Sequence, residues 1–181
     1  MNTETNTYVN TDSGFTDSDA CATAAQYGQL DVLAYLTEHG VAMDNKTCES
    51  AAHGGHLDIL QFAKECGCPW DGKTGAVAAF QAHFDILKWL HLNGCPWDNR
   101  VCENAADTGN LEMLQWAVQH GCPWNIPRCL EAAKSGREDA LAWSNTGPTN
   151  IEDRALAQRY DAVIAWIESE SETDNESDEE C

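Results

Sequence analysis

Cysteine is the residue of this chain whose abundance and spacing could do chemistry. Most of the nine cysteines fall into two columns at intervals of 27 residues: Cys21, Cys48, Cys102 and Cys129, then Cys68, Cys95 and Cys122. A disulfide needs Cα atoms within about 7 Å, whereas equivalent residues on neighbouring packed helices lie about 8–10 Å apart. Zinc sites favour close Cys-x-x-Cys pairs, and the chain offers locally only Cys66-x-Cys68. We therefore predict reduced structural thiols, with no metal ion and no cofactor.

Histidine gives no catalytic arrangement in this sequence. His53 and His56 have the spacing of a ligand pair, but Gly54-Gly55 lies between them at an expected helix break. The sequence also contains no nucleophile elbow, no phosphate-binding loop and no Ser-His-Asp arrangement. We therefore predict that the protein is not an enzyme and has no catalytic residues.

A repeat of 27 residues positions these side chains. An Ala-Ala pair, a leucine, an aromatic residue and a glycine each recur at this interval, and a Cys-Pro-Trp-Asp motif follows the glycine. Such self-similarity in one register is the signature of a repeat architecture. Six of the seven tryptophans follow the same phase, which favours stacking inside the fold. The Ala-Ala pairs are Ala24-Ala25, Ala51-Ala52, Ala78-Ala79, Ala105-Ala106 and Ala132-Ala133.

Each unit predicts two short helices. In the second unit Asp44 is a natural N-cap, and the first helix is expected over about 45–53. Gly54-Gly55 ends that helix, and the second helix is expected to begin near Leu57. Gly67 suits a left-handed backbone after the last turn, and the proline of the next motif blocks further helix.

Stacking of these helix pairs defines the fold, because one pair cannot bury its own apolar face. We predict an all-α solenoid of stacked helix-turn-helix repeats over 19–167. It is expected to lie between a disordered polar and acidic segment, 1–18, and a disordered acidic tail, 168–181. The five units are expected near 20–46, 47–73, 74–100, 101–127 and 128–144, with a degenerate C-terminal cap over 145–167.

The repeat unit resembles the ankyrin repeat. The residues that carry the resemblance are Asp71-Gly72-Lys73-Thr74, Ala78-Ala79 and the segment Gly54-Gly55-His56-Leu57-Asp58-Ile59-Leu60. They are similar to the family's Asp-Gly-x-Thr opening, its Ala-Ala pair and its Gly-His-Leu-Glu-Val-Val segment, and the resemblance covers about 20–143. The short Cys-Pro-Trp-Asp variety is similar to repeats expanded in large DNA viruses and some protists. The resemblance implies protein–protein interaction without catalysis.

The unit departs from the usual ankyrin repeat in two places. It is shorter than the usual unit of about 33 residues, because Gly-Cys-Pro-Trp-Asp replaces the longer hairpin segment. Thr74 is also not followed by the family's Pro-Leu-His. We therefore expect the projecting β-hairpin fingers to be reduced or absent, so that binding falls to the first-helix face.

Charge disfavours nucleic acid as a partner. The net charge is -20, and both ends of the chain are acidic without basic residues, whereas phosphate binding needs a basic surface. No stretch approaches the roughly 18 apolar residues of a membrane span, and the sequence opens without a secretion signal. The odd number of cysteines and the missing secretion signal favour a reduced intracellular setting, cytoplasmic or alternatively nuclear, so the protein is expected to be neither secreted nor bound to a membrane. We also expect a monomer.

The outward columns of the first helix identify a candidate binding surface, because there the repeats differ from one another. The column of greatest interest reads Gln26, His53, Phe80, Asp107 and Lys134. In the third unit Phe80, Val77 and Ala76 replace polar residues of the neighbouring units. An apolar patch with a polar rim is typical of a binding hot spot. The alternative is that this helix shifts, since Gln81-Ala82 replaces the Gly-Gly turn, and buries Phe80.

A further column forms a short basic stripe of Lys46, Lys73 and Arg100. It could take an acidic partner segment, and the alternative is a solvated face. Together these residues predict a non-catalytic module that binds another protein through the first-helix face of its repeats. The alternative function is a structural or self-assembling repeat element.

Overall fold

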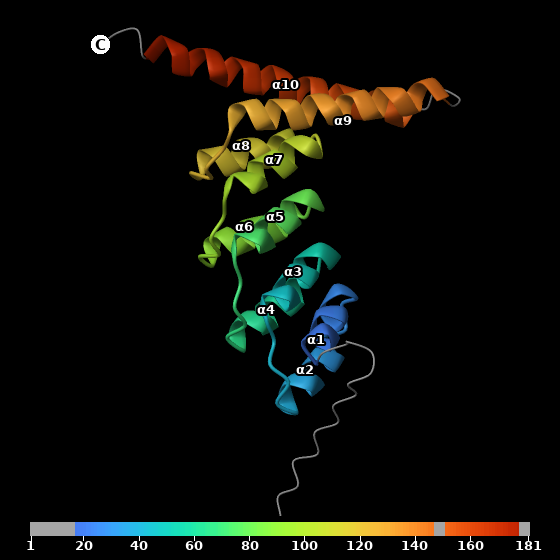
Figure 1. The fold of residues 1–181 in the computed structure, drawn as a ribbon, viewed down its shortest axis with the longest axis vertical. Helices are drawn as coiled ribbons and strands as arrows, with labels where there is room; N and C mark the ends of the chain where they lie inside the picture. Colours follow the sequence, from blue (N-terminus) through green and yellow to red (C-terminus); the bar gives the residue numbers. More distant parts are fainter. Residues whose placement is uncertain (1–16, 147–150, 178–181) are drawn as a thin grey trace, which may run out of the picture. The chain divides into compact units, whose positions relative to one another are not determined.

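The computed structural model describes residues 17–146 and 151–177, with side chains at 18–142 and 154–171. Every regular element in these ranges is an α-helix, as the sequence predicts, and no β-finger is present in them (Figure 1). The chain divides into two compact units, Met1–Pro69 and Trp70–Cys181. Most of the segment predicted to be disordered at 1–18, and the last residues of the acidic tail, lie outside the described residues.

Both units are built from helical pairs. The first unit contains α1 (Asp17–Gln26), α2 (Leu30–Glu38), α3 (Asn45–Gly54) and α4 (Leu57–Glu65). The second unit contains α5 (Gly72–Phe80), α6 (Phe84–Leu92), α7 (Asn99–Asp107), α8 (Leu111–Gln119), α9 (Ile126–Thr146) and α10 (Ile151–Ser177). Odd-numbered helices are the first helices of the repeats. Within the first unit α1 packs on α3, and within the second α5 packs on α7 and α7 on α9.

Aspartate caps begin the first helices as predicted. The Asp44 carboxylate accepts a hydrogen bond from Thr47 N at 3.3 Å, and the Asp71 carboxylate accepts one from Lys73 N at 2.9 Å. Each cap satisfies a backbone N–H that has no partner inside the helix. The aspartate caps therefore fix where these first helices begin, and so they fix the register of the repeat.

The Ala-Ala pairs bring neighbouring first helices close together. Both alanines are essentially excluded from solvent in the first four units, and Ala133 is fully buried in the fifth. Small side chains at these positions allow close backbone approach and dense packing. Leucines from the second helices, Leu33, Leu60, Leu87 and Leu114, complete the core.

The cysteine of each Cys-Pro-Trp motif ties the end of a helix pair to the aspartate that begins the same pair. Cys68 Sγ donates to the Asp44 carbonyl at 3.1 Å, and Cys95 Sγ donates to the Asp71 carbonyl at 3.4 Å. Cys122 makes the same contact with Asp98. These three thiols are buried, as the sequence predicts.

The two cysteine columns also meet, which sequence reasoning did not anticipate. Cys48 Sγ lies 3.4 Å from Cys68 Sγ in the first unit. The hydrogen bond with Cys48, together with burial, raises the pKa of the Cys68 thiol above its usual value. A raised pKa suppresses the reactive thiolate, so the two thiols of this pair have a structural role in the packed interior.

The fifth repeat differs from the predicted boundaries. Residues 128–144 do not form a helix-turn-helix; α9 runs unbroken from Ile126 to Thr146 and α10 returns alongside it (Figure 1). The tail predicted to be disordered at 168–181 is instead helical to Ser177. The Lys134 ammonium also lies 3.5 Å from a Glu168 carboxylate oxygen, which holds the start of that segment against α9.

Residues of α10 occupy the place that a second helix has in the other repeats. His56 Nε2 lies 3.2 Å from the Gln26 carbonyl at the end of α1, and the Tyr160 hydroxyl donates in the same way to the Asp107 carbonyl at 2.6 Å. Trp166 stacks on Trp124 with 5.6 Å between ring centroids. The repeat places the corresponding pairs at Trp70–Trp89, 5.8 Å, and Trp97–Trp116, 5.9 Å.

The predicted cap over 145–167 is therefore only in part a repeat element: residues 160–167 of α10 form the displaced second helix of the fifth repeat, and the helical residues described between Gly136 and Tyr160 are an insertion. Counted from Tyr160, fully buried Val163 and Ile167 match the buried Met113 and Ala117 counted from Asn110. A Cβ at Gly136 would lie 2.6 Å from the Tyr160 ring, so glycine is required there for this ring to dock.

Candidate interaction surface

Phe80 is exposed at the end of α5. Its side chain is 52% exposed, which contradicts the alternative that a shifted helix buries it. His53 and Lys134, in the same column, are also exposed, and Asp107 is half-buried. The column therefore faces solvent as predicted, although His53 belongs to the first unit and Phe80, Asp107 and Lys134 belong to the second.

The apolar patch around Phe80 is narrower than the sequence predicted. Val77 is half-buried, and Ala76 is only 4% exposed, so the prediction that Ala76 faces outward was wrong. The cause is the packing of α7 on α5: Asn104 Nδ2 donates to the Ala76 carbonyl at 2.7 Å. The surface that remains is Phe80 with the edge of Val77.

The turn after Phe80 is held in a strained conformation. Ala82 has φ 58, and it is the one non-glycine residue with positive φ among the residues that the structure describes. Gly55 and Gly109 take the same place in other repeats with φ 80 and 65. The left-handed region costs an alanine about 1 kcal/mol or more. The turn thus keeps its shape without glycine, and Phe80 is presented in the same register as its counterparts.

The predicted basic stripe is largely neutralised by its own neighbours. Arg100 donates to the Asp98 carboxylate through Nε at 3.0 Å and Nη2 at 2.7 Å. This hydrogen-bonded guanidinium holds the pKa of Asp98 below its usual value. Lys46 lies 3.5 Å from Asp19, and Lys73 is exposed. The stripe is therefore a weak candidate for an acidic partner segment.

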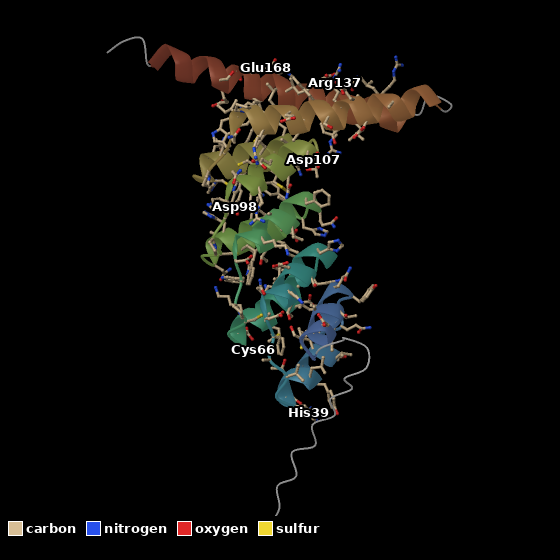
Figure 2. All side chains as sticks on the ribbon, in the orientation of Figure 1. His39, Cys66, Asp98, Asp107, Arg137 and Glu168 are labelled. Carbon is tan, nitrogen blue, oxygen red and sulfur yellow. The ribbon has the colours of Figure 1, made fainter. Side chains whose placement is uncertain are left out.

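An acidic hollow lies between α7 and α9, beside the Phe80 column. It has a volume of about 370 Å³ and is lined by Glu103, Asp107, Arg128, Glu131, Ala132 and Ser135. Figure 2 labels Asp107 at the carboxyl end of α7 and Arg137 where α9 runs along α10. The sequence analysis singled out only Asp107 of this set, although the acidic change of neighbouring columns at Glu103 and Glu131 was a visible signal.

Asp107 is the electrostatic centre of this hollow. Burial, and then the negative charge of Asp139, raise the pKa of the Asp107 carboxyl above its usual value. Burial and the same two carboxylates raise the pKa of Tyr160 as well, while Arg159 opposes them. A cation placed beside a carboxyl group whose charged form is disfavoured stabilises that charged form.

Tryptophan and histidine form a separate cluster on the second helices of the same unit. His91 stacks on Trp97 with centroids 4.1 Å apart, and His120 stacks on Trp116 at 4.3 Å. Burial, with a smaller effect of His120, lowers the pKa of His91. The rings are mostly half-buried and edge-packed across α6 and α8, which fits the stacking role that the sequence predicts.

Two comparisons with known proteins find no match. No model of a known protein family matches the chain, and no curated protein is similar to it at a significant level. Among the described residues, no three His, Cys, Asp or Glu side chains are arranged to hold a metal ion. No helix in the described ranges combines the length and apolar character that crossing a membrane would take.

Proposed function

We propose that this chain is a non-catalytic protein-interaction module that binds another protein through the first-helix face of its repeats. The observation that carries the proposal is Phe80, an aromatic side chain 52% exposed at the end of α5, directly before the strained turn at Ala82. Exposed aromatic side chains at the centre of a surface are typical binding hot spots. Backbone strain is likewise concentrated at functional positions.

The ankyrin family is part of the proposal. It is supported by the helix pairs, the left-handed turns and the Ala-Ala contacts between first helices, together with the motifs of the sequence. An intracellular site of action is supported by the eight free cysteines of the described residues, which suit a reducing compartment. A non-enzymatic role is supported by the structural use of two groups whose pKa is shifted: Asp98 caps α7, and Cys68 donates to the Asp44 carbonyl within one helix pair.

Affinity capture from the native host with Phe80→Asp as the comparison tests this function. We expect Phe80→Asp to abolish capture of a specific partner and to leave the melting temperature nearly unchanged, because the side chain is half exposed. Leu92→Asp is the matched control: Leu92 is 80% exposed at the end of α6, away from the first-helix face. Equal capture by the wild type and Phe80→Asp would refute the proposed surface.

Self-assembly is the second candidate, and Val32 favours it. Val32 is 45% exposed, whereas Ile59 and Met113, at the same position of later repeats, are fully buried. Tyr35, on the same helix, is 59% exposed. Light scattering over a dilution series separates the two functions. An oligomer that Val32→Asp dissolves and Phe80→Asp leaves intact would establish self-assembly through the first repeat.

A further inference from the structure

The surface beside Phe80 carries negative charge that a basic partner would neutralise. Phe80 is the last residue of α5 and Asp107 the last residue of α7, and these helices pack against each other. Neither helix has a basic residue in its last turn. The carboxyl end of a helix carries a partial negative charge, which a cation stabilises and a carboxylate opposes. Both helix ends therefore lack the basic side chain that usually compensates this partial charge.

The chain's own cations near this surface are engaged elsewhere. Arg128 lies 3.5 Å from Glu103, Lys134 lies 3.5 Å from Glu168, and Arg137 is paired with Asp161. Among the described residues, no lysine or arginine forms a salt bridge with Asp107, and the charge that acts on its carboxyl is the like charge of Asp139. The open hollow beside Asp107 leaves room for an incoming side chain.

An apolar contact and a charged contact thus stand one repeat apart. Equivalent positions on packed helices are about 8–10 Å apart. A chain in the polyproline II conformation rises about 3.1 Å per residue with three residues per turn, so side chains three residues apart lie on one face about 9 Å from each other. A segment that lies across α5 and α7 would therefore place side chains three residues apart over Phe80 and Asp107.

We infer that the partner presents a segment in the polyproline II conformation with an aromatic or aliphatic residue and, three residues away, a lysine or arginine. The apolar side chain covers Phe80 and Val77, and the cation enters the acidic hollow at Asp107. This inference rests on the proposed function, and it names the partner's chemistry. Charge complementarity of this kind also predicts binding that weakens as salt is added.

A peptide array tests the inference with the full chain. The probes are peptides of 12 residues in a Gly/Ser background, with one Phe, Leu or Trp and, three residues away, Lys, Arg, Gln or Glu. We expect the labelled protein to bind only the Lys and Arg series, at low salt. Phe80→Ser and Asp107→Asn should each weaken binding about tenfold or more, equivalent to about 1.4 kcal/mol. Leu92→Ser and Glu112→Gln, on the other face, should not.

The outcomes distinguish the inference from the proposed function. Binding of the Gln or Glu series that still depends on Phe80 would overturn the basic partner and support the Phe80 surface. Binding of the Lys series that Phe80→Ser leaves unchanged would overturn the Phe80 surface. An array without signal, or equal binding by Asp107→Asn, would overturn the inference, and capture from the host would then decide the function separately.

Discussion

The thiol of each Cys-Pro-Trp motif explains why cysteine stands at these positions. It is buried, and it donates to the carbonyl of the aspartate that caps the first helix of the same helix pair. Cys95, for example, donates to the Asp71 carbonyl. An aliphatic residue would fill the space but leave that carbonyl without this contact. A cysteine column in a reduced protein is thus a hydrogen-bonding column, which spacing alone did not reveal.

A buried hydroxyl marks a position where the sequence is not optimal for stability. Thr74 is fully buried and its hydroxyl has no hydrogen-bond partner among the described groups. An unsatisfied buried polar group costs about 1–3 kcal/mol, and the next repeat has fully buried Val101 in the same column. We expect Thr74→Val to raise the free energy of unfolding by about 1 kcal/mol in urea denaturation. A lower value than wild type would show that the hydroxyl has a partner.

We expect the charged Asp107 carboxylate to lower the stability of the folded protein, although it contributes to the proposed binding. Its pKa is raised, so the charged form is disfavoured in the folded state and stability falls as pH rises through that pKa. Asp107→Asn should therefore be more stable than the wild type at pH 7. The difference should vanish as pH falls to the ordinary carboxyl value of 3.8. Thermal melts of both proteins between pH 3 and pH 7 measure this. A difference that grows on acidification would contradict the assignment.

At the scale of helices, the fifth repeat keeps its contacts but takes its second helix from farther along the chain. The segment after Gly136 begins Arg137-Glu138-Asp139 and lacks the apolar residues that begin α4 and α8. It therefore continues α9 as helix. Tyr160, Val163 and Trp166 supply the missing contacts from α10.

Deletion of residues 137–159 tests this reading. Gly136 would then precede Tyr160 as Gly109 precedes Asn110, in register with the other repeats. We expect a folded protein that retains the Trp124–Trp166 contact, with a melting temperature within roughly 5 °C of the full chain. Circular dichroism and tryptophan fluorescence report these properties.

A register control sharpens the deletion. Removing 138–159 leaves one extra residue in the turn and displaces the Tyr160 ring from its site at Gly136. This variant should melt at a lower temperature than the in-register deletion. Equal stability of the two would mean that α10 does not take the place of a second helix.

The sequence predicted the four regular repeats because their signals are local. Asp44 and Asp71 cap helices, glycines turn the chain, and alanine pairs mark close contacts, each within one unit. It failed at the fifth repeat because Leu141 and Trp143 continue the 27-residue phase by position alone, while the true counterparts lie after an insertion. The same difference applies to the interaction surface. The exposure of Phe80 could be predicted from one column of the repeat, whereas the burial of Ala76 depends on how α7 packs on α5.

At the scale of the whole molecule, the two units differ in how their ends are finished. The second unit ends in α10, which buries Tyr160, Val163 and Ile167. The first unit exposes Val32 and Tyr35 on α2. A repeat array gains stability from each interface that it buries and from polar terminal caps.

The isolated units are therefore expected to differ in stability. A fragment of residues 70–181 should unfold cooperatively on its own. A fragment of residues 1–69 should melt at a temperature lower by roughly 10 °C or more. Thermal circular dichroism of the two fragments and the full chain measures this. A more stable fragment 1–69 would show that the exposed face of α2 is no weakness.

The contact between Tyr160 and Asp107 also sets an order of events during synthesis. It joins residues separated by 53 positions, whereas the equivalent contact of His56 joins residues separated by 30. A ribosome delivers about 5–20 residues each second. The four regular repeats can therefore fold while the chain is still growing. Gly136 of α9 and Trp124, which contact Tyr160 and Trp166 in the finished fold, stay exposed to solvent until the last helix emerges.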